Sequence, residues 1–129
     1  MGGNLMVLYI LAGGIVGTLG RWQLDGWIQR VSGAGTFPVG TLVINVSGSF
    51  VIGFVARLGT GSTVISPDVR GGLTIGLCGA FTTMSTFSYE SVRLLGAGDY
   101  ARAALYLGAT IFGCLGAVVG GSLLAGRIL

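Results

Sequence analysis

The sequence contains no lysine and no histidine, and charged residues make up only 9% of its 129 positions. Soluble domains carry about a quarter charged residues, so most of the surface of this chain does not face water. The absence of histidine removes the usual metal ligand and the usual proton relay near neutral pH. The seven arginines give a net charge of +3 but are scattered singly, which argues against nucleic-acid binding.

Cysteine is also scarce. Cys78 and Cys114 lie in apolar stretches, and their spacing matches no metal-binding or redox motif, so we interpret them as small buried residues. No Ser-His, Cys-His or clustered-carboxylate set is available for catalysis, and we do not expect an enzyme.

Hydrophobic residues, by contrast, make up 52% of the chain, and there are 26 glycines. Small residues are typical of membrane helices, whose backbones approach one another closely. Four apolar stretches are each long enough to cross about 30 Å of hydrocarbon. No basic residue precedes the first stretch, so it does not resemble a signal peptide. The sequence therefore predicts an all-α integral membrane protein, a single domain over 1–129 with four transmembrane helices at 5–28, 39–58, 69–95 and 100–128.

The arginines are almost evenly divided between the two sides of such a bundle. Four spans put both termini on one side, with Arg57, Arg70 and Arg127, and leave Arg21, Arg30, Arg93 and Arg102 on the other. Orientation normally follows an excess of basic residues in cytoplasmic loops. Because one side has only one more arginine than the other, the sequence favours dual topology, in which oppositely inserted copies pair as an antiparallel homodimer. Alternatively, one arginine or the surrounding lipid decides the orientation.

Polar residues recur on one face of the second span, because Thr41, Asn45 and Ser49 are four residues apart. The Asn45 amide has two N–H donors that could serve a desolvated anion. The same amide could instead hold two helices together.

The third span has a polar middle, with five hydroxyl residues between positions 82 and 88. Such side chains compete with helical hydrogen bonds, and Gly79 weakens the helix locally, so we expect this span to be broken near its middle. Freed carbonyl groups suit a small cation, and freed N–H groups suit an anion. Glu90 is expected to pair with a nearby donor such as Arg93.

Two side-chain sets beside this region have two interpretations each. Met84 and Phe87 face the same way, and a phenyl ring could turn its positive edge to an anion, although core packing is the usual role. Tyr106, Thr110 and Cys114 form a stripe that is either a polar track or a packing surface. Pairs of small residues four apart predict close helix packing at Gly13 and Gly17, at Gly72 and Gly76, and at Gly116 and Gly120.

Three motifs resemble those of the small bacterial fluoride channels, the Fluc family. They are Gly17-x-x-x-Arg21-Trp22, Gly40-Thr41-Leu42-x-x-Asn45-x-x-Gly48, and Gly79-x-x-Thr82-Thr83-x-Ser85-Thr86-Phe87-Ser88-x-Glu90. The resemblance covers almost the whole chain, and the third motif is the most specific. It implies a fluoride-selective channel for passive export through two pores of an antiparallel dimer, in lipid of the bacterial inner membrane.

The resemblance also implies roles for individual residues. Asn45 would donate to fluoride, Phe87 would turn its ring edge to the ion path, and Arg21 would lie near an aqueous vestibule. A structural sodium ion at the dimer centre would be held by the carbonyls of Gly79 and Thr82. The remaining residues of the implied pathway are Thr41, Met84, Ser85, Thr86, Tyr106 and Thr110.

One position departs from the family pattern, because Met84 stands where the family usually has phenylalanine and offers no ring edge. The alternative function is a small proton-coupled multidrug transporter, which needs a carboxylate deep in the first span. The first acid of this chain is Asp25, near the predicted end of that span. A non-transporting membrane adaptor would gain nothing from the hydroxyl-rich third span.

Overall fold

The computed structural model describes residues 2–33, 35–60 and 64–129, and the regular elements in these ranges are helices. The second and fourth helices begin at the residues predicted, and the first extends beyond its predicted bounds at both ends. The elements are α1 (Gly2–Ser32), α2 (Val39–Gly59), α3 (Pro67–Gly71), η1 (Gly72–Cys78), α4 (Gly79–Phe81), α5 (Met84–Gly96) and α6 (Tyr100–Ile128).

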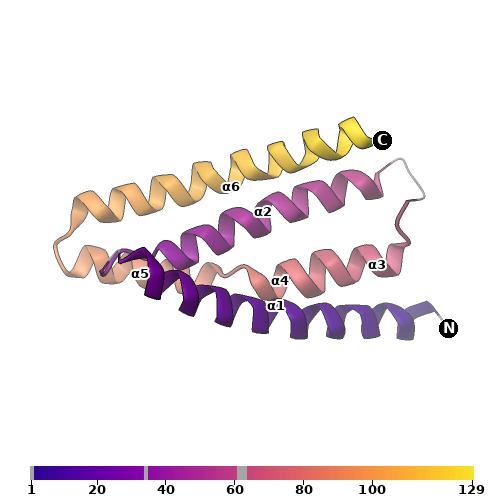
Figure 1. Ribbon diagram of the computed structural model, residues 1–129, viewed down its shortest axis with the longest axis horizontal. Coiled ribbons are helices and arrows are strands. Elements are labelled where there is room, and N and C mark those ends of the chain that lie inside the picture. Colours follow the sequence, from indigo (N-terminus) through magenta and orange to yellow (C-terminus); the bar gives the residue numbers. More distant parts are fainter. Residues whose placement is uncertain (1, 34, 61–63) are drawn as a thin grey trace.

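Within the described ranges, three helices are long and apolar enough to cross a membrane, namely α1, α2 and α6. The third predicted span is instead divided, and its pieces α3, η1, α4 and α5 follow one another along the length of the bundle (Figure 1). Both termini lie at one end of the bundle (Figure 1), as an even number of crossings requires.

Local sequence explains where the helices begin. The Asp99 side chain accepts the Arg102 N–H at 3.3 Å and caps α6 after a turn in which Gly98 has a φ of +74°. The Ser66 hydroxyl accepts the Val69 N–H at 3.3 Å, and Pro67 follows at the first helical position of α3.

Glycines allow the helices to pack backbone against backbone. A Cβ atom at Gly13 would collide with the carbonyl of Gly72, and one at Gly76 would collide with the carbonyl of Ile10, so α1 lies directly on η1 as the small-residue pairs predict. The prediction for α6 is wrong in detail. Gly116 meets nothing within 4 Å, whereas Gly121 lies against the carbonyl of Phe50 in α2.

The segment η1 is a π-helix, which the sequence did not predict. The Gly79 N–H at its end donates to the carbonyls of Thr74 and Gly76. π-Helical turns occur mostly as short bulges, often at functional sites. The π-helix η1 packs against α1 and leads directly into the broken part of the span.

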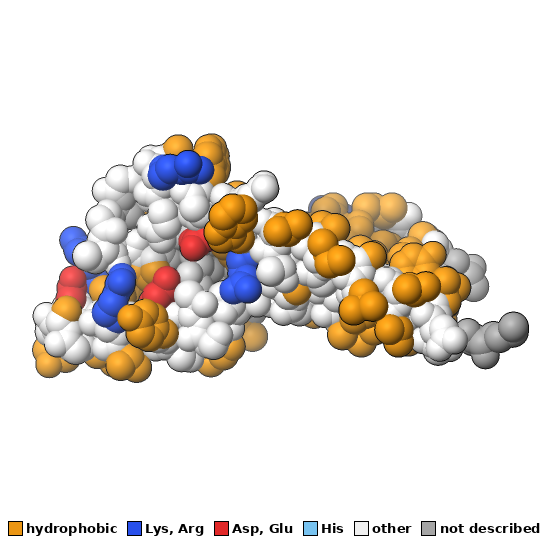
Figure 2. Space-filling view, turned by 90° about the horizontal axis from the view of Figure 1, so that it is seen from below, with side chains coloured by type: hydrophobic (Ala, Val, Ile, Leu, Met, Phe, Trp, Pro, Cys, Tyr) orange, Lys and Arg blue, Asp and Glu red, His pale blue; other side chains and the backbone are white. Residues whose placement is uncertain are grey.

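The outer surface is largely hydrophobic. Figure 2 shows charged side chains gathered towards one end of the visible face and hydrophobic side chains over the remainder. Most of the apolar windows of α1 and α6 are exposed, an area far larger than soluble monomers leave in water. Trp22 and Trp27 are exposed near the charged end of α1, where an interfacial aromatic belt would lie. The chain is a multi-pass membrane protein.

Candidate functional site

The centre of the site is the break between α4 and α5, at Thr82 and Thr83. Both residues have extended backbone, with φ and ψ of −81° and 157° at Thr82 and of −149° and 115° at Thr83. The last bond of the first half runs from the Thr82 N–H to the Cys78 carbonyl at 3.0 Å. The predicted break is therefore confirmed, at the position of the hydroxyl-rich run.

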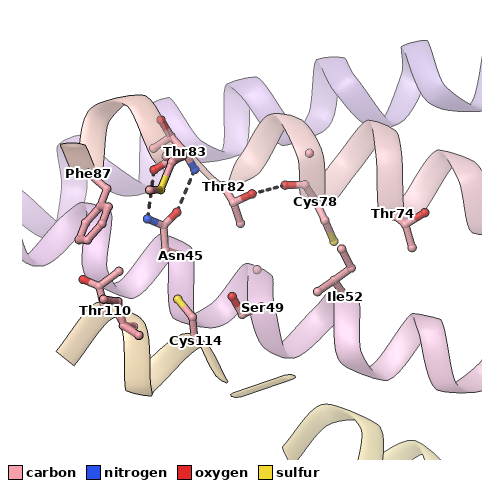
Figure 3. A pocket seen from close by; sticks show the side chains of 14 residues that line it. Asn45, Ser49, Ile52, Thr74, Cys78, Thr82, Thr83, Phe87, Thr110 and Cys114 are labelled. Atoms are coloured by element: carbon pink, nitrogen blue, oxygen red, sulfur yellow. Dashed lines mark hydrogen bonds between the residues drawn. The ribbon is translucent and has the colours of Figure 1, made fainter. Parts of the chain in front are cut away.

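Asn45 of α2 pairs with the backbone at this break. The Thr83 N–H donates to Asn45 Oδ1 at 2.9 Å, and Asn45 Nδ2 donates to the Thr83 carbonyl at 3.2 Å (Figure 3). Only 8% of the residue is exposed, so these bonds form away from bulk water. The interpretation that Asn45 joins two helices is confirmed, and its role as a donor to an anion stays a prediction, for which one N–H of the amide is left.

This pairing changes the hydrogen bonding of Gly79. In a continuous α-helix the Thr83 N–H would donate to the Gly79 carbonyl, four residues back. Asn45 Oδ1 takes that N–H instead. The Gly79 carbonyl thereby loses the partner that a regular helix would supply.

The Thr83 hydroxyl affects Thr82 in the same way. It accepts the Thr86 N–H at 3.2 Å and caps α5. A regular helix would direct that N–H to the Thr82 carbonyl. The same hydroxyl donates to Thr86 Oγ1 at 3.0 Å and lies 3.3 Å from Ser85 Oγ. Thr83 therefore organises both the start of α5 and the hydroxyl cluster on it.

A groove of about 440 Å³ runs along the break. The Thr110 hydroxyl on its far wall is buried and has no hydrogen-bond partner within the described ranges. Figure 3 shows polar side chains from α2, α6 and the broken span along this groove. Its lining residues are Asn45, Gly48, Ser49, Ile52, Thr74, Cys78, Gly79, Thr82, Thr83, Met84, Phe87, Thr110, Ile111 and Cys114.

The groove brings together six of the residues predicted for the site: Asn45, Gly79, Thr82, Met84, Phe87 and Thr110. The other five lie outside its lining. Ser85 and Thr86 bond to the Thr83 hydroxyl at the start of α5, Thr41 and Tyr106 are buried behind the groove, and Arg21 lies on α1.

The stripe on α6 is thus divided, because Thr110 and Cys114 line the groove while Tyr106 is buried in the bundle. The Tyr106 ring packs against Phe87, with centroids 5.2 Å apart, and edge-on against Phe37 at 5.8 Å. Phe87 itself is 6% exposed. Phe87 therefore packs in the hydrophobic core and also lines the groove.

The expected partner of Glu90 is wrong. Its carboxylate accepts the Tyr106 hydroxyl at 2.7 Å, whereas Arg93 donates to the Thr36 carbonyl at 3.4 Å. Arg93 was predicted because it is the nearest basic residue in sequence, three positions after Glu90, but its side chain is exposed. The actual partner lies 16 residues away on α6, where the buried phenol needs an acceptor.

The sequence indicated no functional role for Thr83 or Cys78, and both line the groove. The prediction that Cys78 is buried is confirmed, whereas Cys114 is half-buried. Threonine is a preferred residue immediately before a helix, and this signal could have identified Thr83 as a cap. Cys78 carried no comparable signal.

Comparison with known proteins agrees with this architecture. A family model described as "CrcB-like protein, Camphor Resistance (CrcB)" matches residues 8–122. A Geobacter metallireducens protein named fluoride-specific ion channel FluC is 43% identical over 111 residues, covering 86% of this chain and 89% of the relative. A Methanosarcina acetivorans protein named fluoride-specific ion channel FluC 1 is 43% identical over 119 residues, covering 92% and 89%. With the match extending over nearly all four crossings, the chain belongs to the CrcB family.

Proposed function

We propose that this protein is a fluoride-selective ion channel that lets fluoride leave the cell passively along the groove at the broken span. The observation that carries the proposal is the break itself, beside which a groove with amide and hydroxyl groups in its wall runs through the bundle. Non-helical backbone at membrane depth is tolerated only where it is buried in protein or lines a cavity. The relatives are named fluoride-specific ion channels, and these names indicate that the transported ion is fluoride. The protein is thus a transport protein rather than an enzyme.

The chemistry of the groove suits a small, strongly hydrated anion. Asn45 keeps one amide N–H beyond its bond to Thr83, and the buried Thr110 hydroxyl is a donor without a partner in the described ranges. The ring of Phe87 adds a positively polarised edge. These donors replace water without a fixed charge in the groove, and conduction needs binding that is favourable yet weak enough for release.

A second copy in the opposite orientation would complete the pathway. The groove is open in a single chain, Gly79 is exposed, and Met84 is 72% exposed at its edge. A fluoride path open to acyl chains would not conduct, so a protein surface must cover it. The near-even distribution of arginines supports insertion both ways up, and an antiparallel dimer of such copies would contain two pores.

A structural sodium ion at the dimer centre fits the residues of the break. The carbonyls of Gly79 and Thr82 have both lost their regular helical partners to Asn45 and Thr83, so each offers a hard oxygen ligand. A symmetric pair of copies would supply four such oxygens. When bound, the ion would balance these carbonyl dipoles and join the two broken spans.

The decisive experiment measures ion efflux from liposomes of bacterial lipid containing the purified protein. Fluoride should leave rapidly once a potassium ionophore balances charge, and chloride should not. Protein-free liposomes report leakage, and the Ser49→Ala protein reports the loss of one groove hydroxyl that makes no bond to the break. Equal flux of chloride and fluoride would refute the assignment.

A further inference from the structure

A second polar cluster lies on α1, outside the groove. Arg21 and Asp25 are four residues apart and so share one helix face. Arg21 Nε and Asp25 Oδ1 are both buried, and neither has a hydrogen-bond partner in the part of the chain that the structure describes. Buried polar atoms without protein partners normally contact water or an ion. The two atoms therefore stand out as polar groups that no bond within the described ranges satisfies.

The Asp25 carboxylate lies against the start of α2. A Cβ atom at Gly40, the second residue of α2, would collide with Asp25 Oδ1. The residue before α2 is Pro38, whose side chain supplies no cap. The amino end of a helix carries a partial positive charge and attracts anions. Asp25 occupies the position that a free anion would otherwise take there.

The same carboxylate connects the cluster to the proposed pathway. Gly40, against which the carboxylate lies, is five residues before Asn45 of the groove wall on the same helix, a rise of about 7.5 Å. The described groups placed beside Asp25 are Arg21 on its own helix and Gly40 of α2.

We propose that Asp25 sets how tightly fluoride is held in the pathway, because its carboxylate offsets the positive charge of Arg21 and of the amino end of α2. This inference rests on the proposed fluoride conduction. Two positive groups with no counter-charge would retain a fluoride ion instead of passing it on. A fixed carboxylate beside them lowers the local potential without entering the groove. Asp25 thus tunes the affinity of the pathway for fluoride through its electrostatic field.

The test compares Asp25→Asn with Asp68→Asn, which removes the same charge from the opposite end of the bundle. Initial fluoride efflux is measured against fluoride concentration at low and at high concentrations of an impermeant salt. Asp25→Asn should lower the half-saturating fluoride concentration about three- to tenfold at low ionic strength, and salt should shrink the effect. Asp68→Asn should match the wild type.

Two further variants keep the test decisive if Asp25→Asn folds poorly. Arg21→Gln should raise the half-saturating concentration, and the double variant Arg21→Gln, Asp25→Asn should return towards the wild type. Half-saturation in Asp25→Asn equal to that of the wild type, or a change that salt does not affect, would overturn the inference while wild-type flux upholds the channel assignment. Wild-type protein without fluoride flux would overturn both.

Discussion

Asn45 and Thr83 exchange two hydrogen bonds across the break, with the Asn45 amide matching the N–H and the carbonyl of one extended residue. The two residues are 38 positions apart, on different membrane crossings. The pair joins α2 to the broken span at the point where the backbone leaves the helix. A side chain at this position must both accept and donate.

Replacing Asn45 with aspartate tests this requirement. The introduced carboxylate would still accept the Thr83 N–H but would direct an oxygen at the Thr83 carbonyl, at a cost of about 1–3 kcal/mol for the unsatisfied group. The substitution would also remove the N–H proposed to face fluoride. We expect fluoride efflux to fall at least about tenfold, with a lower thermal unfolding midpoint in detergent. Ser47→Ala, on the same helix but outside the groove lining, is the matched control, and normal flux through Asn45→Asp would remove Asn45 from the pathway.

Thr83 can be tested by substitutions that keep or delete its hydroxyl. Thr83→Ala removes the cap of α5 and should destabilise the protein by about 1 kcal/mol, whereas Thr83→Ser should retain most of the stability. Thermal unfolding in detergent measures the difference. Since the hydroxyl also fixes the direction of Thr86, fluoride flux should fall in Thr83→Ala alone. Identical unfolding midpoints for the two variants would contradict the capping role.

The contact between α1 and η1 makes opposite predictions for adjacent glycines. An alanine Cβ at Gly13 would collide with the Gly72 carbonyl and lie 2.8 Å from the Leu77 nitrogen, whereas Gly14 meets nothing within 4 Å. Gly13→Ala should cost about 1–3 kcal/mol through overpacking. Gly14→Ala should be neutral or stabilising by up to about 1 kcal/mol, since alanine is the better helix former. Equal effects of the two substitutions on the unfolding midpoint would show that the helices are not in backbone contact.

Met84 offers a substitution towards the family pattern. Its side chain is 72% exposed at the groove edge, so a phenyl ring can be accommodated without displacing any residue of the same chain. Met84→Phe should fold normally and should preserve or raise fluoride flux, because the ring would add a positively polarised edge. Flux per protein in liposomes is the measurement. A collapse in flux with an intact fold would mean that Met84 is required as it stands.

The helix bounds were predictable where a local signal marks them. Asp99 and Gly98 place the start of α6, and the glycine- and proline-containing loop places the start of α2. The end of α1 was not predictable, because the predicted span 5–28 follows the apolar stretch of the sequence. Leaving the apolar layer does not interrupt backbone hydrogen bonding, and the helix continues to Ser32.

The break was predictable from residue types, but its partners were not. Glycine and hydroxyl side chains weaken a helix through local contacts, which sequence displays. The pairing of Asn45 with Thr83 and of Tyr106 with Glu90 depends on how separate crossings align. Some hydroxyls of the run also serve their own helix, since Ser88 donates to the Met84 carbonyl at 2.9 Å. The number of polar residues in the run is therefore larger than the number of polar side chains that are free to contact an ion.

The two halves of the broken span are supported by different neighbours. The first half, α3 to α4, lies mainly on α1, while α5 packs on α6. Helices tilt to match the thickness of the bilayer that holds them. The Thr83 N–H donates to Asn45 instead of Gly79, so the regular helical bonding of the first half ends at Thr82. We therefore expect a change of tilt that affects α1 and α6 unequally to be taken up between Thr82 and Thr83, so that the width of the groove depends on lipid chain length.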